Sequence, residues 1–447
     1  IDNDGLPDLA TAWNQNQVIQ IHLQRRDADG TVRFESVQIA GTTPIAIVAG
    51  IKLADMDADG WVDIVVLAKH QGLLPICPLN GDVQTEAFTG VALILFSPGG
   101  AAIESGENWT ETQIERSLEA NPSPPGGLPP GLPGAGPDRE IDVPEEGGMT
   151  ALDVGDVTGD GLPDVVITSN RPDEPCHPSG ENDVELYPNP GATVARVGTS
   201  WSTQVIVDRD APVLKDMLLF DIDSDGDLDV VFTRPAAASQ NIAWRENVGG
   251  GVFGIRRPIG HIDTGADVMA LGDVDADGLT DILVRSNAAQ VLQWFRHPSP
   301  DDDLNVSNVL SGIPWSVFSL IELVDSVPLG ISLGDINFDG QPEVLLGADG
   351  RILWLDSSTA PTVFDNWSPN LIVDDSLAGD PLFGAAAAAF INNLLVVDID
   401  CDGANDIIGT IDRRDLSGLS TDVLVWFRNT LLPEDVGIDQ PLVPGCP

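Results

Sequence analysis

Residues 221–229 read Asp-Ile-Asp-Ser-Asp-Gly-Asp-Leu-Asp, and this stretch is one copy of a pattern that recurs along the whole chain. In the pattern, acids stand at positions one, three, five and nine, and glycine stands at position six. The seven copies contain Asp2, Asp4 and Asp8; Asp55, Asp57, Asp59 and Asp63; Asp156, Thr158, Asp160 and Asp164; Asp221, Asp223, Asp225 and Asp229; Asp273, Asp275, Asp277 and Asp281; Asp335, Asn337, Asp339 and Glu343; and Asp398, Asp400, Asp402 and Asp406. The copies recur about every 66 residues, which is typical of a repeat protein. The first copy lacks its opening acid, so we expect the given sequence to begin inside a repeat.

Each copy lies between two short apolar runs. Val230–Thr233 and Ile282–Val284 follow their acidic loops directly, and segments ending in Trp244 or Trp294 come next. Short runs rich in Val and Ile that are bounded by Gly, Asp and Asn predict strands. Four strands per unit and seven units predict an all-β fold, a seven-bladed β-propeller. The predicted blades span approximately 1–43, 44–116, 146–209, 210–262, 263–324, 325–385 and 386–447, with a loop rich in Pro and Gly at 117–145.

The acidic loops carry the chemistry of a calcium site. Alternate acids direct several carboxylates at one point, glycine permits a sharp turn, and Ca²⁺ prefers six to eight hard oxygen ligands. Thr158 and Asn337 replace acids at position three but keep a neutral oxygen. An EF-hand is excluded because position twelve, which would hold its glutamate, falls in the next strand. The alternative is an Asp-rich turn without metal. About seven calcium sites are therefore predicted.

With these residues in view, the chain resembles the VCBS/FG-GAP repeat family, whose propellers include the head of the integrin α-chain. The loop, the Val/Ile strand after it and the Trp426–Asn429 segment carry the resemblance. The resemblance implies that each loop joins the first and second strands of a blade and binds Ca²⁺. The Phe-Gly…Gly-Ala-Pro signature of integrins is mostly missing, so the bacterial VCBS type is the better match.

The composition limits the classes of partner that the protein could bind and the compartment in which it is expected. The 447 residues contain 70 Asp and Glu against 21 Lys and Arg, a net charge of −49, which argues against nucleic acid because phosphate binding needs basic patches. No apolar run is long enough for membrane insertion as a helix. Four cysteines, an even number, fit two disulfides in an oxidising compartment, and we predict Cys77–Cys176 and Cys401–Cys446. The expected location is extracellular or at the cell surface.

The ligand is less defined by the sequence. A basic residue recurs after the second strand of several blades and is a candidate for binding an anionic sugar or carboxylate: Lys69, Arg171, Arg234, Arg285 and Arg413. Inserts at 69–90 and 170–183 are expected on the face opposite the acidic loops, where binding to a glycan or protein is favoured. A polysaccharide lyase using His177, Tyr187 and Arg171 is one alternative, and a self-associating assembly subunit is another. The scarcity of His and Tyr favours a protein that is not an enzyme.

Overall fold

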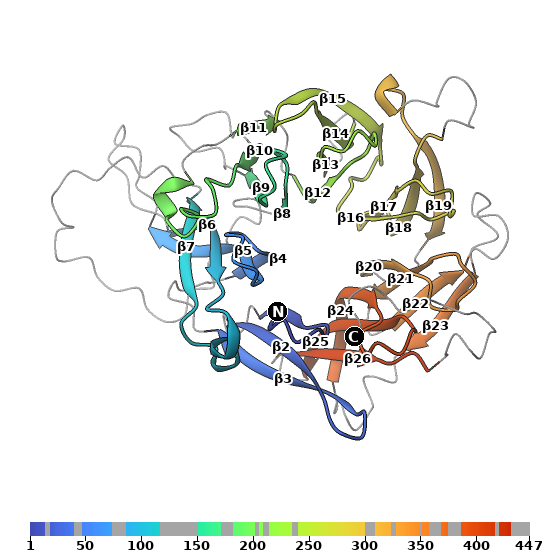
Figure 1. The fold of residues 1–447 in the computed structure, drawn as a ribbon. Coiled ribbons are helices and arrows are strands. Elements are labelled where there is room, and N and C mark those ends of the chain that lie inside the picture. The colour runs from blue at the N-terminus through green and yellow to red at the C-terminus, as the bar shows by residue number, and fades with distance from the viewer. Residues whose placement is uncertain are drawn as a thin grey trace.

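The computed structural model describes residues 1–13, 18–39, 47–73, 86–116, 151–170, 182–201, 205–208, 214–234, 240–299, 309–322, 328–348, 351–356, 368–373, 386–415 and 420–430. These residues form seven antiparallel sheets arranged around a central axis (Figure 1). The predicted seven-bladed β-propeller is confirmed. The loop predicted at 117–145 lies outside the described residues. Among the described helices, none is long and apolar enough to span a membrane.

The strands follow the chain order blade by blade. Blade 1 holds β1(Leu9–Trp13), β2(Val18–Arg26) and β3(Val32–Ile39); blade 2 holds β4(Ile47–Ala54), β5(Asp63–Leu73), β6(Glu86–Phe96) and β7(Thr110–Arg116); blade 3 holds β8(Leu152–Gly155), β9(Asp164–Asn170), β10(Asn182–Tyr187) and β11(Val205–Asp208). Blade 4 holds β12(Met217–Phe220), β13(Asp229–Thr233), β14(Ile242–Asn247) and β15(Phe253–Gly260); blade 5 holds β16(Val268–Gly272), β17(Asp281–Ser286), β18(Val291–Arg296) and β19(Ser316–Glu322). Blade 6 holds β20(Pro328–Gly334), β21(Glu343–Ala348), β22(Arg351–Asp356) and β23(Ser368–Val373); blade 7 holds β24(Ala386–Val397), β25(Asp406–Asp415) and β26(Ser420–Phe427). The described residues also contain three 3-10 helices, which lie between strands: η1(Gly100–Ser105), η2(Gly198–Ser200) and η3(Val309–Ser311).

The described part of blade 1 begins at the second strand of the repeat, because β1 follows the first acidic loop. The innermost strands of blades 2, 3, 4, 5 and 7 line a central cavity of about 790 Å³, and β1 lines it in blade 1. Lys52 and Asp216 are charged residues in this lining, and Thr11, Asn393 and Thr410 are polar ones. The propeller therefore has a partly polar axis between apolar blades.

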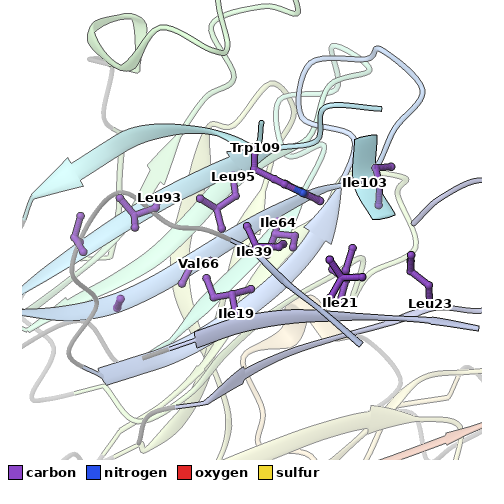
Figure 2. Close-up of a cluster of buried hydrophobic side chains, with 13 residues drawn as sticks. Ile19, Ile21, Leu23, Ile39, Ile64, Val66, Leu93, Leu95, Ile103 and Trp109 are labelled. Atoms are coloured by element: carbon purple, nitrogen blue, oxygen red, sulfur yellow. The ribbon is translucent and has the colours of Figure 1, made fainter. Parts of the chain in front are cut away.

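The core lies between blades rather than inside one sheet. Each of six apolar clusters draws residues from two consecutive blades. Figure 2 shows the first cluster, where Ile19 and Ile21 of β2 meet Ile64, Val66 and Leu93 of blade 2. Second strands such as β13 and β17 are buried along their whole length because both of their faces are covered by neighbouring blades. This explains why they read as continuous Val/Ile runs.

Glycine permits close approach between blades at the end of three innermost strands. A Cβ built on Gly155, Gly272 or Gly334 would lie 2.6 Å from Leu228, 2.9 Å from Leu333 or 2.3 Å from Val396, respectively. Each of these glycines directly precedes an acidic loop. The side chain of the next blade occupies the space that a Cβ would need, so the loops of neighbouring blades are brought close together.

The ring closes where blade 7 meets blade 1. The rings of Phe34 and Trp426 pack edge to face with centroids 6.2 Å apart. The guanidinium of Arg26 donates a hydrogen bond to the backbone carbonyl of Asp400 in the last acidic loop. Strands distant in sequence are thereby joined.

One hairpin differs from its prediction. The insert expected at 69–90 is in part an extension of the sheet, because β5 continues to Leu73 and β6 resumes at Glu86. The residues between these strands lie outside the described part. The acidic loop lies at the beginning of β5 and the hairpin turn at its end, so the hairpin extends on the face opposite the acidic loops.

Candidate metal centre

In blades 2 to 7 the acidic loop joins the first and second strands, and in blade 1 it directly precedes β1; all seven loops have the same backbone shape. Glycine at position six has a positive φ in all seven copies, as the sequence predicts. Position four also has a positive φ everywhere, including Ala58, Ala276 and Phe338 at 52°, 54° and 63°. Residues other than glycine rarely adopt this conformation. The sequence pattern gave no signal for position four, because its side chain varies while its backbone does not.

Carboxylates at positions one and five fold the loop. In blade 4, Asp221 accepts hydrogen bonds from the backbone N–H groups of Asp225 at 3.1 Å and Gly226 at 3.0 Å. Asp225 accepts one from Asp227 at 2.9 Å. This is the side-chain-to-backbone bonding that makes Asp common in turns. Part of each carboxylate is therefore used to shape the loop.

The acid at position nine is buried and connects three strands. Asp229, at the start of β13, accepts N–H bonds from Ile222 at 2.9 Å and from Asn247, at the end of β14, at 2.7 Å. Burial, followed by the nearby acids of the same loop, raises the pKa of this group. The pKa is about 7 for Asp63, Asp229 and Asp281, about 8 for Glu343 and about 6 for Asp406. A bound cation would relieve both causes by favouring the ionised form.

Position three supplies the observation that points most directly to a ligand. The Oδ1 atoms of Asp57, Asp223, Asp275 and Asp400 and the Oγ1 atom of Thr158 are buried without a hydrogen-bond partner. Buried polar atoms are normally satisfied, and here a side-chain oxygen of the same loop position has no partner in five blades, as an aspartate Oδ1 in four of them and as a threonine hydroxyl in blade 3. A hard cation bound in the loop would satisfy these oxygens, so the residues present fit Ca²⁺.

The structure brings most of the predicted ligands together. Among the described residues, groups of three acids with ligand atoms within 4.8 Å occur in blades 2, 4, 5, 6 and 7. They are Asp55, Asp57 and Asp63; Asp221, Asp223 and Asp225; Asp273, Asp275 and Asp281; Asp339, Glu343 and Asp356; and Asp398, Asp400 and Asp406. The loops of blades 1 and 3 do not form such a group. In blade 1 the given sequence contains only positions three, five and nine of the acids, and blade 3 has Thr158 in place of an acid.

Sequence reasoning missed Asp356, which lies at the end of β22 and joins Asp339 and Glu343. It stands outside the repeated pattern and becomes a neighbour only through strand pairing, since Leu355 pairs with Val344. It adds an acid to the loop in which Asn337 had lowered the ligand charge.

Arginines bridge positions three and five in four loops, and the sequence gave no sign of this. Arg25 bonds Asp2 at 2.6 Å and Asp4 at 3.2 Å, and Arg196 bonds Asp57 and Asp59. Arg296 and Arg428 do the same in blades 5 and 7. In blades 2, 5 and 7 the arginine uses the Oδ2 atom of position three, so the buried Oδ1 atom remains without a partner.

A side chain at the end of the third strand connects each of several loops to the preceding one. The Asn247 amide donates to the carbonyl of Val157 in the previous blade at 2.8 Å and to that of Leu228 in its own loop at 3.1 Å. Asn189 makes the equivalent pair of bonds, as does Asn429. In blade 5, His297 Nε2 lies 2.7 Å from the carbonyl of Ile222. The spacing Trp-x-x-Asn in Trp244–Asn247 and Trp426–Asn429 is the sequence signal for this feature.

The predicted anion-binding residues do not form one exposed rim among those described. Arg234 and Arg285 are only 6% and 3% exposed. Lys69 and Arg413 lie in β5 and β25, but their side chains are outside the described part, as is the whole of Arg171. An anion-binding role for these residues stays a prediction.

The remaining candidates are placed in part. Cys401 lies at position four of the last acidic loop, whereas Cys77, Cys176 and Cys446 lie outside the described residues, so both pairings stay predictions. Tyr187 is buried in an apolar cluster and its hydroxyl donates to Glu185 at 2.8 Å. His177 lies outside the described residues.

Comparison with known proteins agrees with the repeat. A family model described as an FG-GAP-like repeat matches residues 1–66 and 221–284. No curated protein matches the chain. The search of solved structures found two matches of low similarity. The crystal structure of BBS1N in complex with ARL6DN, soaked with lead, has 9% identity and a TM-score of 0.44, with 96% of this chain and 91% of that chain covered. The crystal structure of the V. cholerae biofilm matrix protein Bap1 has 10% identity and a TM-score of 0.30, with 96% and 76% covered.

Proposed function

From a seven-bladed propeller built of FG-GAP-like repeats, we propose a calcium-stabilised extracellular module that binds a glycan or protein partner or serves a structural role. The single observation that supports calcium is the buried, unpartnered oxygen at position three, repeated in five loops. Three or four carboxylates this close repel one another strongly without a cation. Calcium would hold these loops and, through them, one face of the propeller.

The opposite face is the proposed place for a partner. There the β5–β6 hairpin extends from a scaffold whose blades share apolar cores, and variable loops on a rigid scaffold commonly carry binding. The extracellular location is supported by the match to FG-GAP-like repeats, and the predicted disulfides would agree with an oxidising compartment. The lyase alternative gains no support from Tyr187, because its hydroxyl is buried and paired.

Metal content and stability test the calcium part of the proposal. Untreated protein is expected to contain several Ca²⁺ per chain, and EDTA is expected to lower the Tm. At a tenfold excess of calcium over Kd, each site adds about 1.4 kcal/mol to the free energy of unfolding. Protein without calcium, and with the same Tm in EDTA, would show that the loops are metal-free turns.

A pair of variants in one loop separates ligand loss from charge loss. Asp223→Asn removes the unpartnered position-three carboxylate and is expected to lower the Tm gained from calcium. Asp227→Asn removes the same charge at position seven of the same loop and is expected to leave that gain nearly unchanged. Equal effects of both variants would count against specific ligation.

A further inference from the structure

The residue that pairs across from the position-nine acid differs in charge from blade to blade. Strand register places it one residue beyond the pairs Val230–Arg245, Ile282–Phe295, Val344–Leu355 and Ile407–Phe427. The residues at this place are Glu246 in blade 4, Arg296 in blade 5, Asp356 in blade 6 and Arg428 in blade 7. Acid and base therefore alternate at one geometric position around this half of the ring.

In blades 5 and 7 the arginine engages its loop in one geometry. Arg296 Nε lies 2.5 Å from Asp275 Oδ2, and its Nη2 lies 2.9 Å from Asp277 Oδ2. Arg428 makes the same two contacts with Asp400 and Asp402 at 2.6 and 3.0 Å. Each guanidinium adds a positive charge beside the proposed cation and neutralises part of two ligands.

Blades 1 and 2 reach the same result from different positions. The residues opposite position nine there are Leu23 and Phe96, which carry no charge. Arg25 bridges the first loop from its own blade. Arg196 reaches the second loop from blade 3, with its guanidinium 4.8 Å from the centre of the Phe96 ring. Four of the seven loops thus have the positive charge of an arginine beside their acids.

In blades 4 and 6 the corresponding residue is an acid. Asp356 lies within 4.8 Å of Asp339 and Glu343 and so adds a possible ligand. Glu246 faces the loop that contains Asp223 and is itself paired with Arg257 at 2.6 Å. Because Arg257 neutralises Glu246, the net negative charge beside the blade 4 site comes from its four loop acids. The blade 6 site also has four acids once Asp356 is included, whereas each loop with a bridging arginine has a net charge of three acids or fewer.

We propose that the side chain opposite position nine sets the calcium affinity of the loops in blades 4 to 7. Blade 4 has no bridging arginine there and blade 6 gains Asp356 as a possible ligand, so both sites are tight, whereas an arginine there makes the sites of blades 5 and 7 weak. Ligand charge is one of the features that tune calcium affinity in proteins. This inference rests on the calcium binding proposed above and orders the sites within it.

Calcium titration by calorimetry, starting from metal-free protein, tests the order. The wild-type chain is expected to show a tight class of two sites and a weaker class. Arg296→Gln is expected to strengthen one weak site roughly tenfold, and Asp356→Asn to weaken one tight site by a similar factor, since charges a few ångströms apart interact appreciably at a protein surface. Arg428→Gln repeats the first test at a side chain that is 54% exposed, where folding is least at risk.

Two control variants make the same changes of charge away from the acidic loops. Arg33→Gln lies at the start of β3, and Asp29→Asn lies between β2 and β3; both side chains are exposed. Both controls are expected to leave the two classes of calcium site unchanged. The inference would be overturned if all sites bound calcium with the same affinity, or if the loop variants changed the calcium affinity no more than their controls. Either result would leave the proposed function intact. Absence of any calcium binding would overturn both.

Discussion

At the scale of the residue, the position-nine acid has two roles in each loop. Asp229 is a fully buried acceptor for two backbone N–H groups and also lies beside the proposed ligands. Its carboxylate fixes the start of the second strand to the end of the third. The loop geometry is consequently built into the blade rather than left to the metal alone.

The raised pKa of these acids predicts an unusual pH dependence for the metal-free protein. The pKa of Asp229 is about 7 in the folded protein, against about 3.9 in an unfolded chain. The folded state therefore binds more protons over this interval, and its stability falls as the pH rises from about 4 to about 7. We expect a higher Tm at pH 5 than at pH 8 in EDTA, and a reduced or reversed difference with saturating calcium. An unchanged Tm across this range in EDTA would contradict the prediction.

The acids were predictable residue by residue because their spacing repeats in the sequence. The bridging arginines were not, because Arg25, Arg196 and Arg296 stand at different distances from the loops that they contact. Asp356 was missed for the same reason. Strand register and blade contacts, which sequence spacing does not reveal, bring these charges to the loops.

At the scale of the element, the end of the third strand links neighbouring blades. Asn247 satisfies carbonyls of two loops with one amide group. Asn247→Ala leaves both carbonyls without this donor and is expected to lower the free energy of unfolding by about 2–4 kcal/mol. Chemical denaturation in calcium would measure the loss.

Ser97 offers the matched control in blade 2. It occupies the place of Asn247, since its N–H bonds the position-nine Asp63, but its hydroxyl accepts only a local bond from Gly99 at 3.2 Å. Ser97→Ala is expected to cost less than half as much. An equal loss in both variants would show that the bond between blades adds nothing.

Strand prediction succeeded where composition and periodicity agree. The second strands are buried on both faces and read as unbroken apolar runs, such as Val230–Thr233. The extension of β5 to Leu73 was missed because Lys69, His70 and Gln71 are polar and end the apolar run in the sequence. The extension of β5 is held by backbone pairing with β6, which the side chains of the sequence do not predict.

At the scale of the whole molecule, the net charge of −49 opposes the compact state through self-repulsion. Dissolved salt screens such repulsion, with a Debye length of about 10 Å at 0.1 M. We expect the Tm of the metal-free protein to rise between 50 and 500 mM NaCl, roughly the range over which screening becomes strong. The calcium-loaded protein should respond less, because bound ions already offset part of the charge. Equal salt responses with and without calcium would contradict this account.

The closure between blades 7 and 1 has a mechanical consequence. Consecutive blades share apolar clusters, whereas the contacts described above between Phe34 and Trp426 and from Arg26 to Asp400 join the ring's first and last blades. A pulling force across these two blades loads that junction first. Once it parts, the ring becomes an open chain of blades that yields one interface at a time, and ions held in the loops would raise the force needed at each step.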